Sequence, residues 1–227
     1  MRRSGAEGVM RIAIDGPAGA GKSTVAKLLA SRLGYTYLDT GALYRALTLA
    51  ALKRGLLNDQ TGLVQLASSQ EITITSTSNC QRVLLNGEDV TEAIRTPEVS
   101  CATSLVARIP EIRELVTAKI RELARGGRIV VEGRDIGTVV LPDAERKFFL
   151  TASLKERARR HLREAQKRGF TLSWEEQLRQ IEARDQQDSS REVAPLKPAP
   201  DAVIIDTTDK TPDEVVEIML RHLEGSS

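Results

Sequence analysis

The stretch IAIDGPAGAGKSTVAKLLA, residues 12–30, decides the fold of the chain. A short apolar run is followed by a loop rich in glycine and then by apolar residues spaced three and four apart. The run 11–15 is typical of a buried β-strand, and the apolar spacing from Val25 to Leu33 predicts a helix over 23–33. We therefore expect a strand, a loop and a helix in immediate succession.

The loop itself, GPAGAGKS, fits the phosphate-binding pattern G-x-x-x-x-G-K-[ST] at every position. Glycines allow tight turns, so backbone N–H groups can surround a phosphate. Lys22 is the expected contact of the β- and γ-phosphates, and Ser23 the expected direct ligand of Mg²⁺. A flexible glycine loop is the simpler alternative, but chance matches rarely lie between a strand and a helix. The residues predicted to bind ATP are Gly16, Pro17, Ala18, Gly19, Ala20, Gly21, Lys22, Ser23 and Thr24.

The composition excludes several classes of protein. Of the 227 residues 41% are hydrophobic, and 33 Lys and Arg nearly balance 31 Asp and Glu, so no surface for a nucleic-acid polymer is indicated. Cys80 and Cys101 lack the spacing of a zinc or disulfide site. No apolar run approaches the ~18 residues of a membrane span. The leader 1–9 lacks the apolar stretch of a signal peptide, so we expect it to be disordered and the protein to be cytoplasmic. We also expect the protein to be monomeric.

Strand-like and helix-like segments alternate along most of the chain. Further strands are expected at 35–38, within 128–137, at 146–150 and at 202–206. Further helices are expected at 42–53, 98–108, 111–125 and 212–223, and the capping boxes Ser153/Glu156, Ser173/Glu176 and Thr211/Glu214 mark helix starts. This alternation predicts a parallel, three-layer α/β sheet. The β-branched segments 71–78 and 81–90 predict a small antiparallel sheet inserted into it.

Two polar motifs directly follow predicted strands. DTGALYRAL at 39–47 brings a Tyr-Arg pair to the start of a helix, where it is equally consistent with an exposed face or a site. EGRDIGTVV at 132–140 places Arg134 and Asp135 on a loop at the carboxyl edge of the sheet, where ligands bind in α/β folds. An ordinary surface turn does not need glycine on both sides, so we interpret the second motif as functional.

Charged residues also recur on two later predicted helices. Arg157 and Arg160 lie three apart, which taken alone is most simply an exposed basic face. On the second helix the charged residues are spaced four and three apart, so that Arg184, Asp188 and Arg191 share one side. Taken alone, this arrangement is most simply explained by an ion pair.

Taken together, these segments resemble the bacterial cytidylate kinases from about Met10 to the C-terminus. The resemblance is carried by IDGPAGAGKST, LDTGALYRAL, IRTPEVS, EGRDIGTVV, RARR and ARDQQDSSREVAPL. It implies transfer of the γ-phosphate of ATP to CMP or dCMP with Mg²⁺ as cofactor. It also implies a P-loop kinase fold with a core at 10–41 and 111–227, a monophosphate-binding arm at 42–110 with a β insert at about 70–95, and a lid at about 153–170.

The resemblance further implies a role for each matching residue. Those expected to bind CMP are Thr40, Tyr44, Arg45, Ser104, Arg113, Arg134, Asp135, Arg184, Asp188 and Arg191. Those expected to act in catalysis are Lys22, Arg134, Arg157 and Arg160. Within the first group, Arg45 and Arg134 would hold the acceptor phosphate with Arg191 nearby, Asp135 would read cytosine with Ser104 and Arg113, and Arg184 and Asp188 would meet the ribose.

The chain departs from the family pattern at Glu132, where many relatives carry Asp. If this carboxylate organises Mg²⁺ through water, the extra methylene should shift the geometry only modestly. In the last motif, the pairs 186–187 and 189–190 replace residues that are often charged, and we expect little effect because they point away from the ribose.

Three other functions compete with this interpretation. A kinase for UMP or AMP would share most of the motifs. A P-loop kinase for a small metabolite such as shikimate would leave the β insert and the Arg184/Asp188/Arg191 face unexplained. A regulatory switch that hydrolyses ATP or GTP would need only one nucleotide, and the sequence carries no NKxD-type guanine signature.

Overall fold

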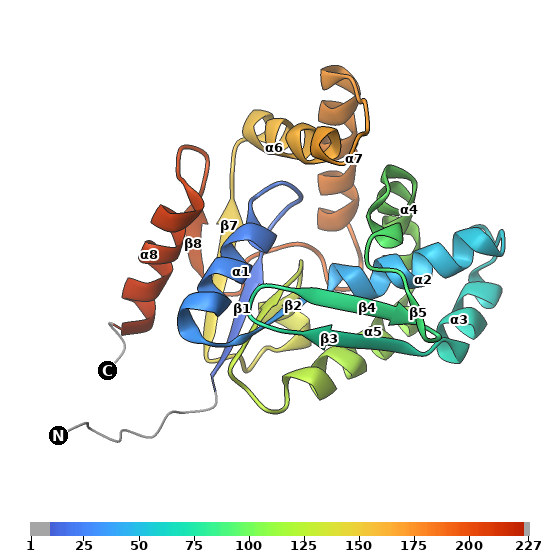
Figure 1. Cartoon of the computed structure of the whole chain (residues 1–227), viewed down its shortest axis with the longest axis horizontal. Coiled ribbons are helices and arrows are strands. Elements are labelled where there is room, and N and C mark those ends of the chain that lie inside the picture. The colour runs from blue at the N-terminus through green and yellow to red at the C-terminus, as the bar shows by residue number, and fades with distance from the viewer. Residues whose placement is uncertain (1–9, 225–227) are drawn as a thin grey trace.

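A parallel five-stranded sheet forms the centre of the computed structural model, which describes residues 10–224 (Figure 1). The predicted leader 1–9 lies outside the described residues. The strand order is β2-β6-β1-β7-β8, and every neighbouring pair is parallel. The strands are β1 (Arg11–Asp15), β2 (Thr36–Asp39), β6 (Ile129–Glu132), β7 (Arg146–Thr151) and β8 (Val203–Asp206). The predicted parallel α/β sheet is therefore confirmed, and its carboxyl ends share one edge.

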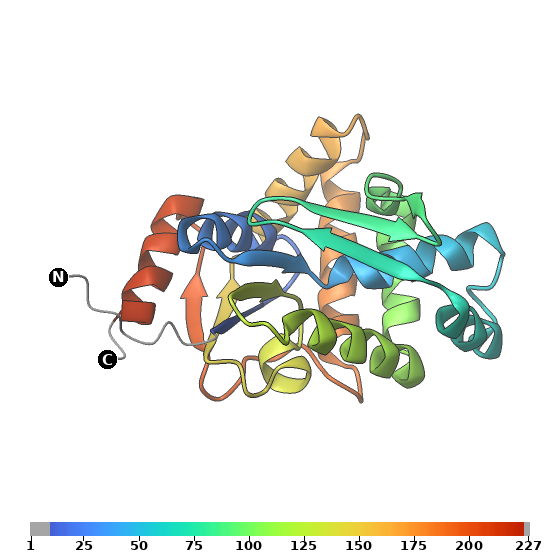
Figure 2. The same cartoon turned by 60° about the horizontal axis from the view of Figure 1, so that its bottom comes forward.

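Helices cover both faces of this sheet. The α-helices of residues 10–224 are α1 (Lys22–Leu33), α2 (Gly41–Lys53), α3 (Gln60–Ser69), α4 (Pro97–Ala107), α5 (Pro110–Ala124), α6 (Leu154–Lys167), α7 (Trp174–Ser189) and α8 (Pro212–Glu224). Successive residues of a strand face opposite sides, so Ile12 and Ile14 pack with α1 and α8 while Ala13 packs with α2 and α5. Figure 2 shows the sheet between these helices. The three layers predicted from the sequence are confirmed.

The inserted antiparallel sheet differs in one respect from the prediction. Its strands are β3 (Ile72–Ser76), β4 (Gln81–Leu85) and β5 (Glu88–Asp89). The predicted antiparallel sheet is confirmed, but the segment 81–90 forms two strands, because Asn86 and Gly87 have φ values of 50° and 83° and turn the chain back on itself. Asn-Gly is the pair best suited to such a turn, since both residues tolerate positive φ.

Helix α3 was not predicted, because its apolar stripe is short. The carboxylate of Asp59 caps its first turn by accepting the N–H of Gly62 at 2.9 Å. Only Leu63 and Leu66 of this helix are fully buried. The Asp-x-x-Gly start with two leucines three apart was the available signal, and packing against α2 and α5 supplies the remaining stability.

The predicted helix starts are confirmed with differing completeness. Thr211 and Glu214 form a full reciprocal capping box, because each accepts the backbone N–H of the other. The hydroxyls of Ser153 and Ser173 accept the N–H three residues on, and the acidic partners bond to other side chains instead. These caps start the helices α6 and α7.

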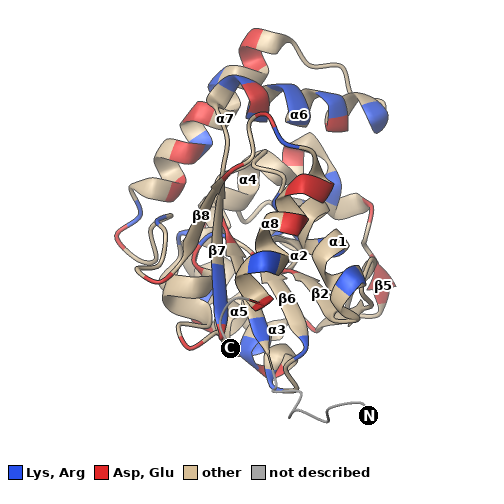
Figure 3. Cartoon of the chain, turned by 90° about the vertical axis from the view of Figure 1, so that its left-hand side faces the viewer, with Lys and Arg blue, Asp and Glu red and all other residues tan. Residues whose placement is uncertain are grey.

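Helices α6 and α7 project beyond the carboxyl edge of the sheet, as Figure 1 shows. Figure 3 shows that both carry residues of both charges. The segment predicted as a lid, at about 153–170, consists of α6 and the start of the connection to α7. The division into a core at 10–41 and 111–227 and an arm at 42–110 stays a prediction, and one apolar cluster runs from the sheet into α2, α3 and α5.

The carboxylate of Asp15 joins the end of β1 to the loop after β6. Its two oxygens accept the N–H groups of Ile136 and Gly137 at 2.8 and 2.7 Å. These residues begin the wide helical turn Ile136–Val140. Asp15 is only 3% exposed. Burial raises the pKa of Asp15 to about 6, although both N–H groups act in the opposite direction.

This raised pKa predicts a specific dependence of stability on pH. The contribution of Asp15 to stability is fully present below its ordinary pKa of 3.8 and is lost as the pH rises through about 6. The free energy of unfolding of the wild type, relative to Asp15→Asn, should therefore fall by ~2 kcal/mol between about pH 4.5 and pH 7. Urea unfolding at a series of pH values measures this difference. Substitution of the exposed Asp209 by Asn is the control, and a flat difference for Asp15→Asn would contradict the prediction.

Candidate active site

The glycine-rich loop leaves β1 at Gly16 and enters α1 at Lys22, in the predicted order of strand, loop and helix. Gly16 has a φ of 145°, and a Cβ there would lie 2.0 Å from the backbone oxygen of Leu150 on β7. No other residue type fits this position. The chain therefore turns immediately at the edge of the sheet and presents the N-terminal end of α1 to the space beyond it.

Lys22 is the buried cation of this loop. Its Nζ donates to the backbone oxygen of Pro17 at 2.7 Å, which holds the side chain along the loop. Burial and then the positive charge of Arg134 lower the pKa of Lys22, while Glu132 acts in the opposite direction. An anion placed in the loop would favour the charged form of this side chain.

Glu132 is a buried carboxylate at the end of β6. Its Oε1 accepts the hydroxyl of Tyr37 at 2.5 Å, and its backbone oxygen accepts the hydroxyl of Thr40 at 2.8 Å. Burial and then the charge of Asp39 raise the pKa of Glu132. Burial also acts to raise the pKa of Asp39. The positive charges of Arg45 and Arg95 outweigh burial and hold this pKa below its ordinary value, and Nη2 of Arg45 lies 2.5 Å from Oδ2 of Asp39.

Arg113 and Asp135 form a buried ion pair on the opposite side of the cleft. Their Nη2 and Oδ2 atoms are 2.5 Å apart, and Arg113 also donates to the backbone oxygen of Ala107 at 3.0 Å. The guanidinium lies 5.7 Å from the ring centroid of Tyr44. The carboxylate is thus fixed from one side by a cation, in a region where Ser104 is also buried.

Asp188 on α7 is a single carboxylate among several arginines. It accepts the Nε of Arg134 at 2.8 Å and the Nη2 of Arg191. Burial and then the charge of Arg134 lower the pKa of Arg184 to about 10, and the buried Nε of Arg184 has no hydrogen-bond partner. The excess of positive charge suits this region to binding an anion.

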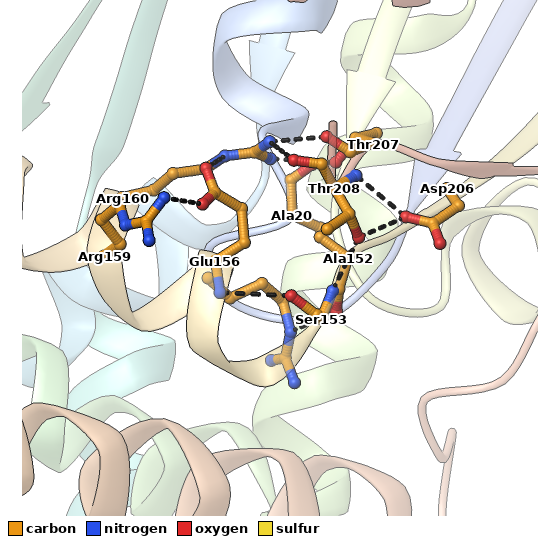
Figure 4. A network of polar contacts seen from close by, with 10 residues as sticks. Ala20, Ala152, Ser153, Glu156, Arg159, Arg160, Asp206, Thr207 and Thr208 are labelled. Atoms are coloured by element: carbon orange, nitrogen blue, oxygen red, sulfur yellow. Dashed lines mark hydrogen bonds and ion pairs between the residues drawn. The ribbon is translucent and has the colours of Figure 1, made fainter. Parts of the chain in front are cut away.

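Helix α6 is joined to the phosphate loop through Thr207, as Figure 4 shows. Arg160 donates to the hydroxyl and the backbone oxygen of Thr207 at 2.9 and 2.6 Å, and that hydroxyl donates to Ala20 at 3.1 Å. Arg157 is buried and donates to the backbone oxygens of Ala152 and Ala18. In this conformation Arg160 faces the cleft and Arg157 is packed beneath α6, so the phosphate contact expected of Arg157 stays a prediction.

One cleft of about 1310 Å³ brings the predicted ATP and CMP residues together. Its lining contains every residue predicted to bind CMP, namely Thr40, Tyr44, Arg45, Ser104, Arg113, Arg134, Asp135, Arg184, Asp188 and Arg191. From the glycine loop it contains Ala18, Gly19, Ala20, Gly21, Lys22, Ser23 and Thr24, together with Arg160 and Glu132. Gly16 and Pro17 lie at the base of the loop.

Three residues at the site, Asp39, Tyr37 and Thr207, were not predicted from the sequence. Asp39 was inside a quoted motif, and its distance of six residues from Arg45 allowed an ion pair across the first turn of α2. Thr207 directly follows β8, so its place at the carboxyl edge of the sheet was the available signal. Tyr37 gave no signal beyond that of an ordinary core residue.

The parallel sheet, the glycine loop and the cation-rich cleft define a P-loop kinase. Among the described residues, no helix is long and apolar enough to cross a bilayer.

Comparisons with known proteins identify the family. The sequence model of the cytidylate kinase family matches residues 12–225. The cytidylate kinase of Caldanaerobacter subterraneus is 53% identical over 92% of this chain and 92% of that protein. That of a Geobacillus species is 54% identical over 92% of this chain and 93% of that protein. The chain belongs to the cytidylate kinase family and is a phosphotransferase.

A solved structure of an uncharacterized protein from Eubacterium ventriosum supports the fold alone. It aligns 96% of this chain with 99% of that one, with a TM-score of 0.52 and 13% sequence identity.

The charge balance around Asp188 predicts a large effect of its removal on stability. Asp188 is 1% exposed, and Asp188→Asn would remove the one carboxylate that contacts both Arg134 and Arg191. We expect a loss of ~3 kcal/mol in the free energy of unfolding, measured by urea denaturation. Asp213→Asn is the matched control, because that exposed partner of Arg32 should cost less than ~1 kcal/mol. Equal losses in the two variants would contradict the prediction.

Proposed function

We propose that this protein transfers the γ-phosphate of ATP to CMP or dCMP, giving CDP or dCDP and ADP in pyrimidine nucleotide metabolism. The observation that carries the proposal is a single cleft with the glycine loop at one side and the buried Arg113–Asp135 pair at the other. Membership of the cytidylate kinase family supports the same reaction. We further propose that the enzyme is monomeric and cytoplasmic and binds neither nucleic-acid polymers nor membranes.

Asp135 is the residue that we propose reads the base. Cytosine carries a 4-amino donor where uracil carries an oxygen acceptor. A carboxylate accepts a hydrogen bond from the amine and repels the oxygen. Because Arg113 holds Asp135 in a buried position, the carboxylate cannot turn away from the wrong base. Discrimination of ~10²–10⁴ against UMP follows by analogy with other hydrogen-bonding sites. Ser104 would contact the same base.

The acceptor's phosphate and ribose would lie between α2, the Arg134 loop and α7. Arginine presents a planar fork that binds phosphate oxygens in pairs. Arg45 and Arg134 would bind the α-phosphate with Arg191 nearby, exchanging part of their present contacts with Asp39 and Asp188. The ribose would meet Arg184 and Asp188, with Thr40 and Tyr44 lining the same part of the cleft.

The transfer itself calls for alignment and neutralised charge. Phosphoryl transfer passes through a loose transition state whose charge is spread over the phosphate oxygens. The acceptor is already an oxyanion at neutral pH, so no side chain is needed as a general base. We assign the stabilisation of the developing charge to Lys22, Arg134 and Arg160, with Arg157 joining them if the lid closes.

The residues on the ATP side fit a magnesium ion. Mg²⁺ prefers oxygen ligands, keeps several waters and is held by one or two carboxylates together with substrate phosphates. Residues 10–224 contain no gathering of three or more His, Cys, Asp or Glu, but the Ser23 hydroxyl and the Glu132 carboxylate both line the cleft beside Lys22. We propose that Ser23 binds the ion directly and Glu132 through water. When bound, the ion neutralises charge on the β- and γ-phosphates.

Exclusion of water would depend on movement of the arm at 42–110 and the lid at about 153–170. In the open cleft, water could attack ATP in place of the acceptor. Closure of both segments over the two nucleotides would remove it. Such closure would also explain why the residues of the site come from segments that are far apart in the sequence.

The first functional prediction concerns the acceptor. With ATP and Mg²⁺, phosphorylation at equal concentrations should be fastest with CMP or dCMP and at least ~10²-fold slower with UMP or AMP. Chromatographic separation of the nucleotides measures the rates. Equal rates with UMP would exclude the proposed role of Asp135, and ADP release that does not require CMP would favour a hydrolysing switch.

A second functional prediction concerns Asp135→Asn. The amide keeps the size of the side chain but removes the charge that pairs with Arg113 and accepts the cytosine amine. We expect kcat/KM for CMP to fall by ~10²-fold or more, while the affinity for ATP changes less than ~3-fold. Calorimetric titration with a non-hydrolysable ATP analogue measures the second quantity. Equal losses for the two nucleotides would mean that the residue is structural.

A further inference from the structure

Tyr37 lies beneath the phosphate loop and is only 1% exposed. Its hydroxyl donates to Oε1 of Glu132 at 2.5 Å. Its ring packs in the apolar cluster under α1, with Nζ of Lys27 5.4 Å from the ring centroid. Its backbone N–H donates to the backbone oxygen of Thr77 in the β insert at 2.9 Å. The phenol is therefore fixed in place by the backbone and by the core, independently of any ligand.

The register of two neighbouring strands explains why the phenol reaches this carboxylate. In the pairing of β2 with β6, Tyr37 is opposite Val130 and Asp39 is opposite Glu132. Residues two apart in a strand face the same side, so Tyr37, Val130 and Glu132 all face α1. The tyrosine thus reaches along the sheet to the carboxylate at the strand end, directly below the helix that begins at Lys22.

The carboxylate of Glu132 needs such a donor. It is buried, and a carboxylate removed from water requires hydrogen-bond donors from the protein. The phenol donates to one of its two oxygens, and the Ser23 hydroxyl lies beside both side chains. A phenol is protonated at neutral pH, so the Tyr37 hydroxyl acts as the donor in this bond. One acceptor site of Glu132 is thereby fixed and the rest face Ser23 and the cleft.

We propose that Tyr37 is a positioning residue that fixes the Glu132 carboxylate, and through it the Ser23 hydroxyl, in the orientation that receives magnesium. The inference rests on the proposed function, because it assigns the ion to this end of the cleft. Hydrogen-bond partners of direct metal ligands are generally worth 10- to 100-fold in metal affinity, and Tyr37, one contact further from the ion, should have an effect at the lower end of this range. Tyr37 touches neither nucleotide nor ion in this arrangement and acts only through Glu132.

The variant Tyr37→Phe tests the inference, because it removes one oxygen atom and keeps the packed ring. Electron paramagnetic resonance with Mn²⁺ as the probe measures metal affinity in the complex of enzyme with ADP. We expect about tenfold weaker Mn²⁺ binding in the variant. The affinity for ADP in the presence of EDTA and the KM for CMP should change less than ~2-fold, and the former confirms that the fold is intact. Tyr35→Phe, at the other tyrosine beside this strand, is the matched control and should change none of these quantities.

A second pair of variants tests whether Tyr37 acts through Glu132. In a Glu132→Ala background, Tyr37→Phe should alter Mn²⁺ affinity less than ~2-fold. The same loss in both backgrounds would overturn the positioning role, and so would an unchanged affinity in the single variant. If the wild-type complex with ADP binds no Mn²⁺, the proposed use of magnesium fails as well. Normal Mn²⁺ binding and CMP phosphorylation by the wild type, with no effect of Tyr37→Phe, would overturn this inference alone.

Discussion

The site depends on one contact, in which the Asp15 carboxylate accepts hydrogen bonds from two backbone N–H groups. The glycine loop follows β1 and the Arg134–Asp135 loop follows β6, so sheet pairing alone aligns their strands but not the loops beyond. The carboxylate at the end of β1 fixes the second loop directly after its two charged residues. Burying it in a region of low dielectric is unfavourable, as its raised pKa shows. The protein nevertheless buries this carboxylate, because it joins the two loops at the point where the donor and acceptor sides of the cleft meet.

A second constraint is the balance of buried charge. Arg45, Arg113 and Arg134 each contact one carboxylate, so these three side chains are already paired before a nucleotide enters. Buried ion pairs gain little net stability, because desolvation offsets attraction. Their effect here is geometric, since each pair holds an arginine fork in a defined direction. A phosphate that carries up to two charges can then take over these forks without large movements of the backbone.

The sequence predicted the parallel sheet and most of its helices, and the ten acceptor-side residues named from the family resemblance all line the cleft. It succeeded where a local pattern determines the result, as in the glycine loop or the capping box at Thr211. It failed where the determining contact is distant in sequence. Helix α3, for example, depends on packing against α2 and α5. The turn at Asn86 is a different case, because its Asn-Gly signal is local and was overlooked within an alternating pattern. Tyr37 could not be singled out because its partner is 95 residues away on another strand.

Helices α6 and α7 connect the two halves of the cleft. Arg157 donates to Ala18 of the glycine loop at 3.2 Å and pairs with Asp185 of α7 at 2.5 Å. Asp185 lies one turn before Asp188, which contacts Arg134 on the acceptor side. One arginine therefore spans the distance between the loop that would hold ATP and the helix that would hold CMP. Because closely packed elements transmit strain, a shift of the glycine loop on binding a ligand would be felt at α7 through this side chain.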